Sequence, residues 1–247
     1  MVKQRFSKKQ MIDNFMFEKK GWTGKSGNSC GPRYVLDTVV HHEQDTSCKY
    51  RIKRLLELAE GLTLETGCNV CGIGMYLSQK NGVKMVELDF MMPALNKANR
   101  KMKLLQKGEY SEGWKAPFCH PPNFKPDCMF VCSDMNHVPF RPEVFDTVVM
   151  SESIEHLPKP HRLKAVKDMV RILKLGGRLV ITTPMLFEDP DRPDWMEDVM
   201  TKVHPYGLAT EKDLLGYAEK LGLELISFET STHDKVTIAF LVAKKNV

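Results

Sequence analysis

The sequence of 247 residues contains no apolar run near the roughly 20 residues of a membrane-spanning helix, and its start, MVKQRFSKKQ, lacks the apolar stretch of a signal peptide. It also lacks an even set of cysteines, since seven are present in a chain long enough to bury a full core. An odd number in such a chain excludes a small disulfide scaffold and favours reduced thiols. These absences predict a soluble, cytoplasmic protein without a membrane span.

A strong excess of one charge is missing from most of the chain. The net charge is +5, but residues 1–60 carry 12 Lys and Arg against 7 Asp and Glu, whereas residues 61–247 carry 24 of each. Neutralising many phosphates needs a concentrated basic face, so the neutral body argues against nucleic acid as a partner. The basic N-terminal part leaves docking of RNA or protein open, although a solvated helix face explains it more simply.

Short apolar segments alternate with helical stretches from Leu62 to the end of the chain. This alternation predicts an α/β fold with a doubly wound, mostly parallel seven-stranded sheet covered by helices on both faces. The last two strands are joined by the short turn THDK, which predicts an antiparallel hairpin at one edge. Strands are expected at 62–67, 83–89, 128–133, 145–150, 178–183, 223–231 and 236–244, and helices at 72–80, 92–106, 160–174 and 210–221.

Residues 1–61 are predicted to form a helical N-terminal cap on the domain of residues 62–247. The cap includes an amphipathic helix at roughly Ser47 to Glu60 that is expected to end at Gly61. Two segments, at about 107–127 and 185–209, are longer than ordinary connections and are expected to be inserts. A long irregular insert in a compact domain tends to be functional or mobile, so both are candidates for the substrate wall.

The stretch LETGCNVCGIG has the pattern of a strand, a tight turn and a helix. Gly67 stands where the backbone must approach a ligand and where the helix amides point towards it. Asp89 ends the next strand 22 residues later, where it can accept hydrogen bonds from both hydroxyls of a ribose. Domains that bind NAD share these two features, so on their own they predict a nucleoside cofactor without identifying it.

Three further phrases identify the pattern more closely: SDMNHVPF at 133–140, FDTVVMSESIEHL at 145–157 and RILKLGGRLVITTP at 171–184. In this order and spacing, the region of about 63–184 resembles the class I S-adenosylmethionine-dependent methyltransferases. It is most similar to the small-molecule branch that includes the ubiquinone and menaquinone biosynthesis methyltransferases. The resemblance implies a Rossmann-like fold, S-adenosyl-L-methionine as cofactor, S-adenosyl-L-homocysteine as product, and a small-molecule methyl acceptor.

The resemblance also implies a role for individual residues. Glu65 would lie under the methionine part of the cofactor, Asp89 would hold the ribose, and Asp134 would accept from the adenine amino group. Ser151 would offer its backbone to the methionine amino group, and the segment LKLGGRL would form the turn into the fifth strand. The full set of predicted cofactor-binding residues is Glu65, Gly67, Cys68, Asn69, Asp89, Phe90, Asp134, Met135 and Ser151.

The turn departs from the family pattern at Asn69 and Cys71, where glycine is usual. Asn tolerates left-handed backbone angles better than other side chains, so Asn69 can replace a turn glycine at modest cost. Cys71 is small and is followed by Gly72 and Gly74. The turn is therefore expected to be competent but tighter, which leaves weakened cofactor binding as an open alternative.

Methyl transfer needs mainly that the nucleophile is held in line with the methyl carbon at close range. A hydroxyl or carbon acid as acceptor also needs a general base, and His204 and His156 are the candidates. His204 lies in the insert at about 185–209, on the expected substrate side. His156 matches the common Glu-His pair after the fourth strand, where the alternative is a structural role.

The cysteines offer a rival chemistry. Cys68 and Cys71 have C-x-x-C spacing, but Cys128 and Cys132 bracket a strand instead of forming a second zinc knuckle, so no metal site is predicted. Two other functions remain open: a methyltransferase-like cofactor-binding protein without turnover, and a protein or RNA methyltransferase. The sequence has SESI after the fourth strand, not the D/N-P-P-Y/F typical of enzymes that methylate exocyclic base nitrogens, and it does not predict the acceptor atom or the oligomeric state.

Overall fold

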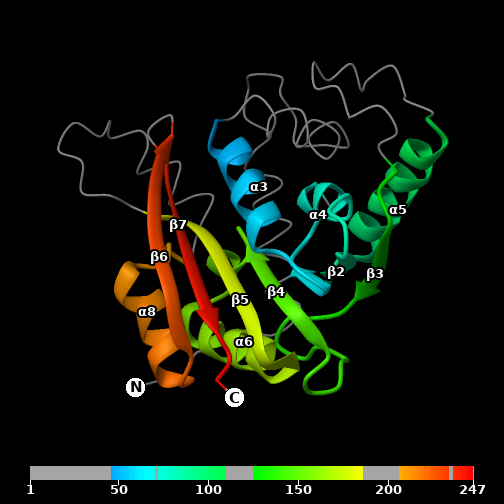
Figure 1. Cartoon of the computed structure of the whole chain (residues 1–247). Helices are drawn as coiled ribbons and strands as arrows, with labels where there is room; N and C mark the ends of the chain where they lie inside the picture. The colour runs from blue at the N-terminus through cyan, green and yellow to red at the C-terminus, as the bar shows by residue number, and fades with distance from the viewer. Residues whose placement is uncertain (1–45, 70–71, 109–124, 186–205, 234–235, 247) are drawn as a thin grey trace.

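Seven strands form one sheet in the order β3-β2-β1-β4-β5-β7-β6 in the computed structural model (Figure 1). The structure describes residues 46–69, 72–108, 125–185, 206–233 and 236–246. The strands are β1 (Leu62–Thr66), β2 (Lys84–Asp89), β3 (Cys128–Cys132), β4 (Phe145–Ser151), β5 (Leu173–Met185), β6 (Glu224–His233) and β7 (Val236–Lys244).

Helices connect these strands where the sequence predicts them, and a short 3-10 helix follows β4. Among the described residues, no helix has the length and apolarity needed to cross a membrane. The helices are α3 (Thr46–Leu58), α4 (Ile73–Leu77), α5 (Met92–Lys107), η2 (Ile154–His156), α6 (Lys159–Ile172) and α8 (Glu211–Lys220).

Strand pairing confirms the predicted doubly wound fold. The ladder from β3 through β2, β1 and β4 to β5 is parallel throughout. β7 is antiparallel to both β5 and β6, which confirms the expected antiparallel ending. Because the parallel strands run the same way, their carboxyl ends meet at one edge of the sheet, and ligands of open α/β sheets bind at such an edge.

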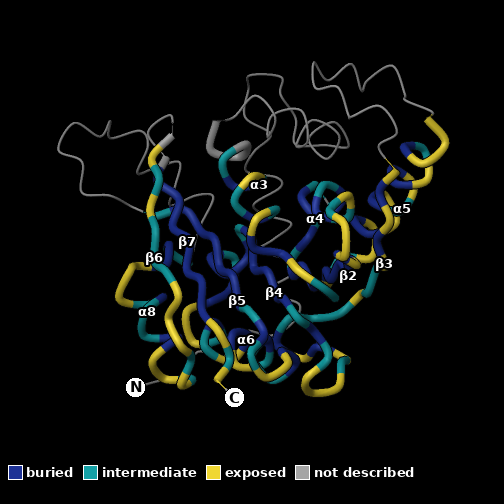
Figure 2. Tube along the Cα trace, viewed as in Figure 1, coloured by how far each residue is buried: buried dark blue, intermediate teal, exposed yellow. Residues whose placement is uncertain are grey.

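The helices cover the sheet from both sides (Figure 1). On one face, residues of α6 and α8 pack with one set of strand side chains, including Leu64, Met150 and Leu241. On the other face, residues of α3, α4 and α5 pack with the alternate set, including Met85 and Phe240. The central strands are accordingly buried along their length in Figure 2. This two-face burial explains their nearly continuous apolar sequences.

Two elements differ from the predicted ranges by more than two residues at one end. The helix expected at 72–80 is shorter, because α4 ends at Leu77 and the chain turns through Ser78. The turn expected in LKLGGRL lies instead within β5, which begins at Leu173 and has an irregular register opposite Phe145. Gly176 has a φ of 74° there, and its amide donates to the Lys245 carbonyl at 2.8 Å, so the glycine pair joins β5 to the chain end.

Candidate cofactor site

The glycine turn begins directly after β1, as the sequence predicts. The amides of Gly67 and Cys68 both donate to the carbonyl oxygen of Leu88, at 2.8 and 3.1 Å. Gly67 has a φ of 72°, and a Cβ there would lie 2.6 Å from the Cβ of Ser153. Both its backbone angle and its surroundings therefore require glycine, because the turn lies closely against the segment that follows β4.

Asp89 holds the next part of the turn. Its Oδ2 accepts from the Asn69 amide at 2.8 Å, and its Oδ1 accepts from the Met91 amide at 2.8 Å. Asn69 has a φ of 49°, which is the left-handed conformation that the sequence predicts it to tolerate. A carboxylate oxygen can accept more than one hydrogen bond, so the bonds from Asn69 and Met91 are compatible with a ligand hydroxyl at Asp89.

The predicted adenine-side residues lie near the carboxyl ends of β2 and β3. The Ser133 amide donates to the Asp89 carbonyl at 3.0 Å, which joins the two strand ends. Asp134 Oδ1 accepts from the backbone and side-chain nitrogens of Asn136, at 2.8 and 3.2 Å. Met135 reaches the turn, since its Cε lies 3.4 Å from the Cβ position of Gly67, and Phe90 is 40% exposed.

The segment after β4 contributes Ser151 and a residue that the sequence analysis missed, Glu152. Ser151 is buried, and its Oγ lies 3.2 Å from the Oγ1 of Thr182. Glu152 has a φ of 48°, and its carboxylate pairs with the buried Arg51 of α3 at 3.1 Å. Arg51 lies on the apolar side of α3 with Leu55. A cation on such an apolar helix face is the sequence signal that could have indicated this ion pair.

Glu87 is a second residue that the sequence analysis missed. It is fully buried in β2 and is the register partner of Glu65 in β1. Glu65 Oε2 accepts from the Gly74 amide at 3.0 Å. Burial raises the pKa of Glu65 to about 7, although hydrogen bonds from Glu87 and Gly74 and the charge of Arg51 oppose this rise. A glutamate inside the apolar strand KMVELD is the signal that could have indicated the pair.

Of the two histidines that the sequence predicts as candidate general bases, only His156 lies within the described residues. His204 lies outside the described residues. His156 lies in η2, and burial, together with the positive charge of Arg162, lowers its pKa to about 4. An imidazole with that pKa is neutral at pH 7 but a weak base, so the structural role is the better supported interpretation of His156.

Within the described residues, no three His, Cys, Asp or Glu side chains form a group that could hold a metal ion. Cys71 lies outside that part of the chain. The absence of a metal site therefore stays a prediction.

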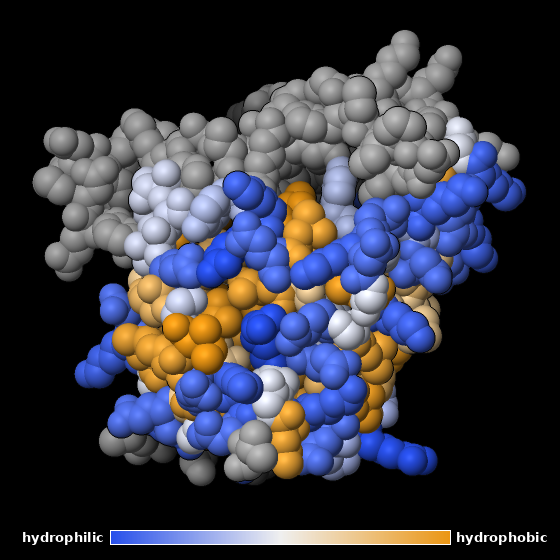
Figure 3. All heavy atoms as spheres, viewed as in Figure 1, coloured by the Kyte–Doolittle hydropathy of each residue, from blue (hydrophilic) through white to orange (hydrophobic). Residues whose placement is uncertain are grey.

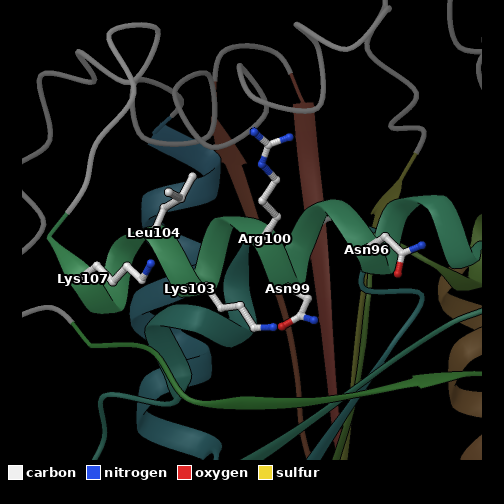
Figure 4. A pocket seen from close by; sticks show the side chains of 6 residues that line it. All are labelled: Asn96, Asn99, Arg100, Lys103, Leu104 and Lys107. Carbon is white, nitrogen blue, oxygen red and sulfur yellow. The ribbon is translucent and has the colours of Figure 1, made fainter.

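A pocket of about 350 Å³ lies away from this edge, on the outer side of α5 (Figure 4). Between residues 81 and 108, all of which are described, every exposed charged side chain is a cation. The surface over α5 is correspondingly hydrophilic in Figure 3. In Figure 4, Asn99 lies beside Lys103. The pocket is lined by Asn96, Asn99, Arg100, Lys103, Leu104 and Lys107.

At the carboxyl edge, the turn after β1, the acid ending β2 and the segments after β3 and β4 lie together. This arrangement combines a carboxylate at a strand end, the backbone of a glycine turn and several further carboxylates, which suits a nucleoside that carries positive charge. Residues 64–181 match the sequence profile of a family described as a methyltransferase domain. This domain, residues 64–181, is of the class I S-adenosylmethionine-dependent methyltransferase type, whose cofactor is S-adenosylmethionine.

The chain is similar to curated proteins with different acceptors. It is 25% identical over 175 residues to a sarcosine/dimethylglycine N-methyltransferase from Halorhodospira halochloris, covering 70% of this chain and 55% of that protein. It is 30% identical over 112 residues to the probable tRNA methyltransferase 9B of Homo sapiens, covering 45% of this chain and 19% of that protein. The chain thus spans about half or less of the length of these relatives.

A solved structure supports the fold. Magnesium protoporphyrin IX methyltransferase from Synechocystis, solved with bound S-adenosylmethionine, has a TM-score of 0.59 and 16% identity. The match covers 99% of this chain and 100% of that one. At this identity the likeness concerns the fold alone.

Proposed function

We propose that this protein transfers a methyl group from S-adenosylmethionine to a small-molecule acceptor. The observation that carries the proposal is the arrangement of Asp89, which holds the glycine turn through the Asn69 amide at the edge where the cofactor of this fold binds. The similarity to an N-methyltransferase that acts on sarcosine and dimethylglycine favours a small acceptor.

The predicted site residues have consistent proposed roles. Asp89 accepts from the ribose, Asp134 accepts from the adenine amino group, and the backbone near Ser151 accepts from the methionine amino group. Gly67, Cys68 and Asn69 supply the turn against the methionine part, above Glu65. Met135 and Phe90 flank the adenine.

Bound S-adenosylmethionine supplies an electrophilic methyl group on a sulfonium. The acceptor forms a bond to the methyl carbon while the carbon–sulfur bond breaks, which leaves neutral S-adenosylhomocysteine. The protein holds the acceptor in line and excludes water. An acceptor that must lose a proton passes it to a base, for which His204 remains the proposed residue.

Calorimetry with S-adenosylhomocysteine tests the proposal. The wild type should bind, and Asp89→Asn should bind at least about tenfold more weakly, because each lost charge-assisted hydrogen bond contributes about 1.5 to 3 kcal/mol. Asp127→Asn, at an exposed position before β3, is the matched control and should leave the affinity unchanged. No binding by the wild type would contradict the proposal.

Labelled S-adenosylmethionine then separates turnover from binding. The protein is incubated with small-molecule and macromolecular fractions of a cell extract, and label should enter the small-molecule fraction. Binding without transfer into any fraction would favour the alternative of a cofactor-binding protein without turnover.

A second candidate acceptor is RNA, and the observation that favours it is the basic face of α5. Lys97, Arg100, Lys103 and Lys107 are exposed along eleven residues of helix, which span about 15 Å. Such a row is long enough for several phosphates, and the neighbouring amide side chains suit sugar and phosphate oxygens. The similarity to a probable tRNA methyltransferase adds support.

Charge reversal separates the two candidates. If RNA is the acceptor, Arg100→Glu with Lys103→Glu should weaken RNA binding strongly and reduce its salt dependence by about two released counterions. Lys212→Glu with Lys220→Glu, at exposed positions of α8, is the matched control. RNA binding that is absent, or equal in both double variants, would contradict an RNA-binding role for α5.

Three broader expectations stay proposals. The division into a cap of residues 1–61 and a domain of residues 62–247 is one, because residues 1–45 lie outside the described part. A cytoplasmic location is the second, and it is supported only by the cysteine content; among the described cysteines, Cys68, Cys128 and Cys132 form no disulfide. The third is that the two inserts form the substrate wall.

A further inference from the structure

Three consecutive residues of β2 hold three different parts of the cofactor turn. The carbonyl of Leu88 accepts from the amides that begin the turn, and the carboxylate of Asp89 accepts from Asn69 in its middle. Glu87 lies at its end, against Gly74 in α4. Leu88 acts through its backbone carbonyl and Asp89 through a hydrogen-bonded carboxylate, whereas Glu87 acts through a buried carboxyl group packed against Gly74.

The contact between Glu87 and Gly74 is unusually close. A Cβ on Gly74 would lie 1.6 Å from Oε1 of Glu87 and 2.4 Å from its Cδ. Gly74 is therefore glycine because the Glu87 carboxyl group occupies the space of a side chain. The same Gly74 donates its amide to Glu65, so both carboxyl groups lie on one short segment of α4.

Glu65 and Glu87 also interact with each other. They are direct register partners on adjacent strands, both are buried, and both carboxyl groups lie against Gly74. Two ionised carboxylates in one buried site repel each other strongly, because little water is present to screen them. One proton shared by the pair removes this repulsion, as occurs when two carboxyl groups occupy one buried site.

The surrounding charges do not remove the need for this proton. Arg51 of α3 is the cation that acts on Glu65, but it is also paired with Glu152. Asp89 of β2 and the Cys68 thiol in the turn face the pair, and the two carboxyl groups and Asp89 help to raise the pKa of that thiol. α5, which packs on β2, buries one cation, Lys101.

We propose that Glu87 is a positioning residue for the cofactor turn, holding Glu65 against the Gly74 amide through a shared proton. When the proton is lost, the two buried carboxylates repel each other, and the nearest segment that can yield is α4 with the turn before it. The turn is then displaced from the position in which it binds the cofactor, and binding is weaker. This inference rests on the proposed cofactor placement at Gly67, Asn69 and Asp89.

Cofactor affinity should consequently depend on pH. The Kd for S-adenosylhomocysteine should be constant below pH 7 and should rise by up to about tenfold per pH unit above it, because binding requires one proton on the pair. The Kd for S-adenosylmethionine should rise in parallel. If the pair acted only as a negative charge, its ionisation would instead favour the sulfonium, and S-adenosylmethionine would bind more tightly as pH rises.

The experiment measures both Kd values from pH 6 to 8.5 by calorimetry for the wild type, Glu87→Gln and Glu219→Gln. The amide that E87Q introduces donates to Glu65 at every pH, so this variant should bind as the wild type does at pH 6 and lose the rise. E219Q changes an exposed glutamate of α8 and should retain the wild-type profile. Thermal unfolding at each pH checks that every protein is folded.

The outcomes are distinct. A wild-type Kd for S-adenosylhomocysteine that does not change with pH overturns the inference, as does an E87Q profile identical to that of the wild type. If E87Q does not fold, the wild-type profiles for the two ligands still decide, because only a displaced turn weakens both. No binding at pH 6 would overturn the proposed function itself.

Discussion

The two faces of the sheet each bury charged side chains, and they do so in opposite ways. On the face covered by α6 and α8, Arg162 is fully buried and donates to the carbonyl oxygens of Leu157, Glu155 and Tyr206 at 2.9, 3.1 and 3.3 Å, and to that of Gly207. On the face covered by α3 to α5, the buried charged groups include a pair of carboxyls, Glu65 and Glu87, at the end of the turn after β1, besides the cations Arg51 and Lys101.

The difference lies in whether the buried charge can change. An arginine keeps its proton throughout the accessible pH range, and backbone carbonyls are fixed acceptors, so the Arg162 cluster has one state. A carboxyl pair has two states that differ by one proton. One face therefore joins the segment after β4 to the chain before α8 permanently, and the other can respond to pH at the proposed cofactor site.

The largest expected effect is on Arg162. Arg162→Met should lower the free energy of unfolding by about 3 kcal/mol or more, because buried carbonyl oxygens lose their donor and each costs about 1 to 3 kcal/mol. Urea unfolding at pH 8 measures the loss, because His156 is neutral there and does not respond to removal of the Arg162 charge. Arg141→Met, at an exposed position, should change stability by less than about 0.5 kcal/mol. A change below about 1 kcal/mol for R162M would contradict the fixed role of Arg162.

The next effect tests the contact between Gly74 and Glu87. Gly74→Ala should destabilise the protein by about 1 to 3 kcal/mol through overpacking against Glu87. Glu87→Ala removes the obstructing atoms, so the double variant should be more stable than the sum of the single changes predicts.

Gly216→Ala is the matched control for this cycle. Gly216 also lies in a helix, α8, but a Cβ there has nothing within 4 Å. That change should stabilise the protein by up to about 1 kcal/mol, because alanine favours the helix. Additive energies in the Gly74 and Glu87 cycle would show that the two residues do not share the space.

A smaller effect concerns stability and pH. The pKa of Glu65 is raised from 4.5 to about 7, so its contribution to stability is fully present below pH 4.5 and is lost as pH rises to 7. The lowered pKa of His156 works in the opposite direction, with stability gained as pH rises from about 4 to 6.5. The two effects partly cancel, so the pH dependence of wild-type stability alone would show neither of them clearly.

Comparison with Glu87→Gln isolates the carboxyl pair, because His156 titrates equally in both proteins. The stability of the wild type relative to E87Q should fall with a slope on the order of 1 kcal/mol per pH unit between about pH 4.5 and 7. Urea unfolding at half-unit intervals measures it. A difference that stays constant over this range would show that the pair holds no shared proton.

The sequence predicts the fold well because its signals are local. Alternating strands and helices, the glycine at 67 and the acid at 89 each follow from a few neighbouring residues. Glu87 and Arg51 were missed because their meaning depends on contacts between elements: the register of β1 with β2, and the packing of α3 across the edge. The extent of β5 was also missed. Two consecutive glycines, Gly176 and Gly177, predict a turn from the sequence, and their pairing with Lys245 is visible only in the structure.

The smallest expected effect is at Asn69, the departure that first put cofactor binding in doubt. Its φ of 49° is accessible to asparagine, and its contribution to the turn is a backbone amide that donates to Asp89. Asn69→Gly keeps this amide and relieves little strain, so stability should change by less than about 0.5 kcal/mol and the Kd for S-adenosylhomocysteine by less than about threefold. Asn69→Ala should cost about 1 kcal/mol, since alanine resists the left-handed conformation. A large gain in affinity for N69G would mean that the turn is strained at Asn69, and would move the main control of binding from the Glu65 and Glu87 pair to the turn itself.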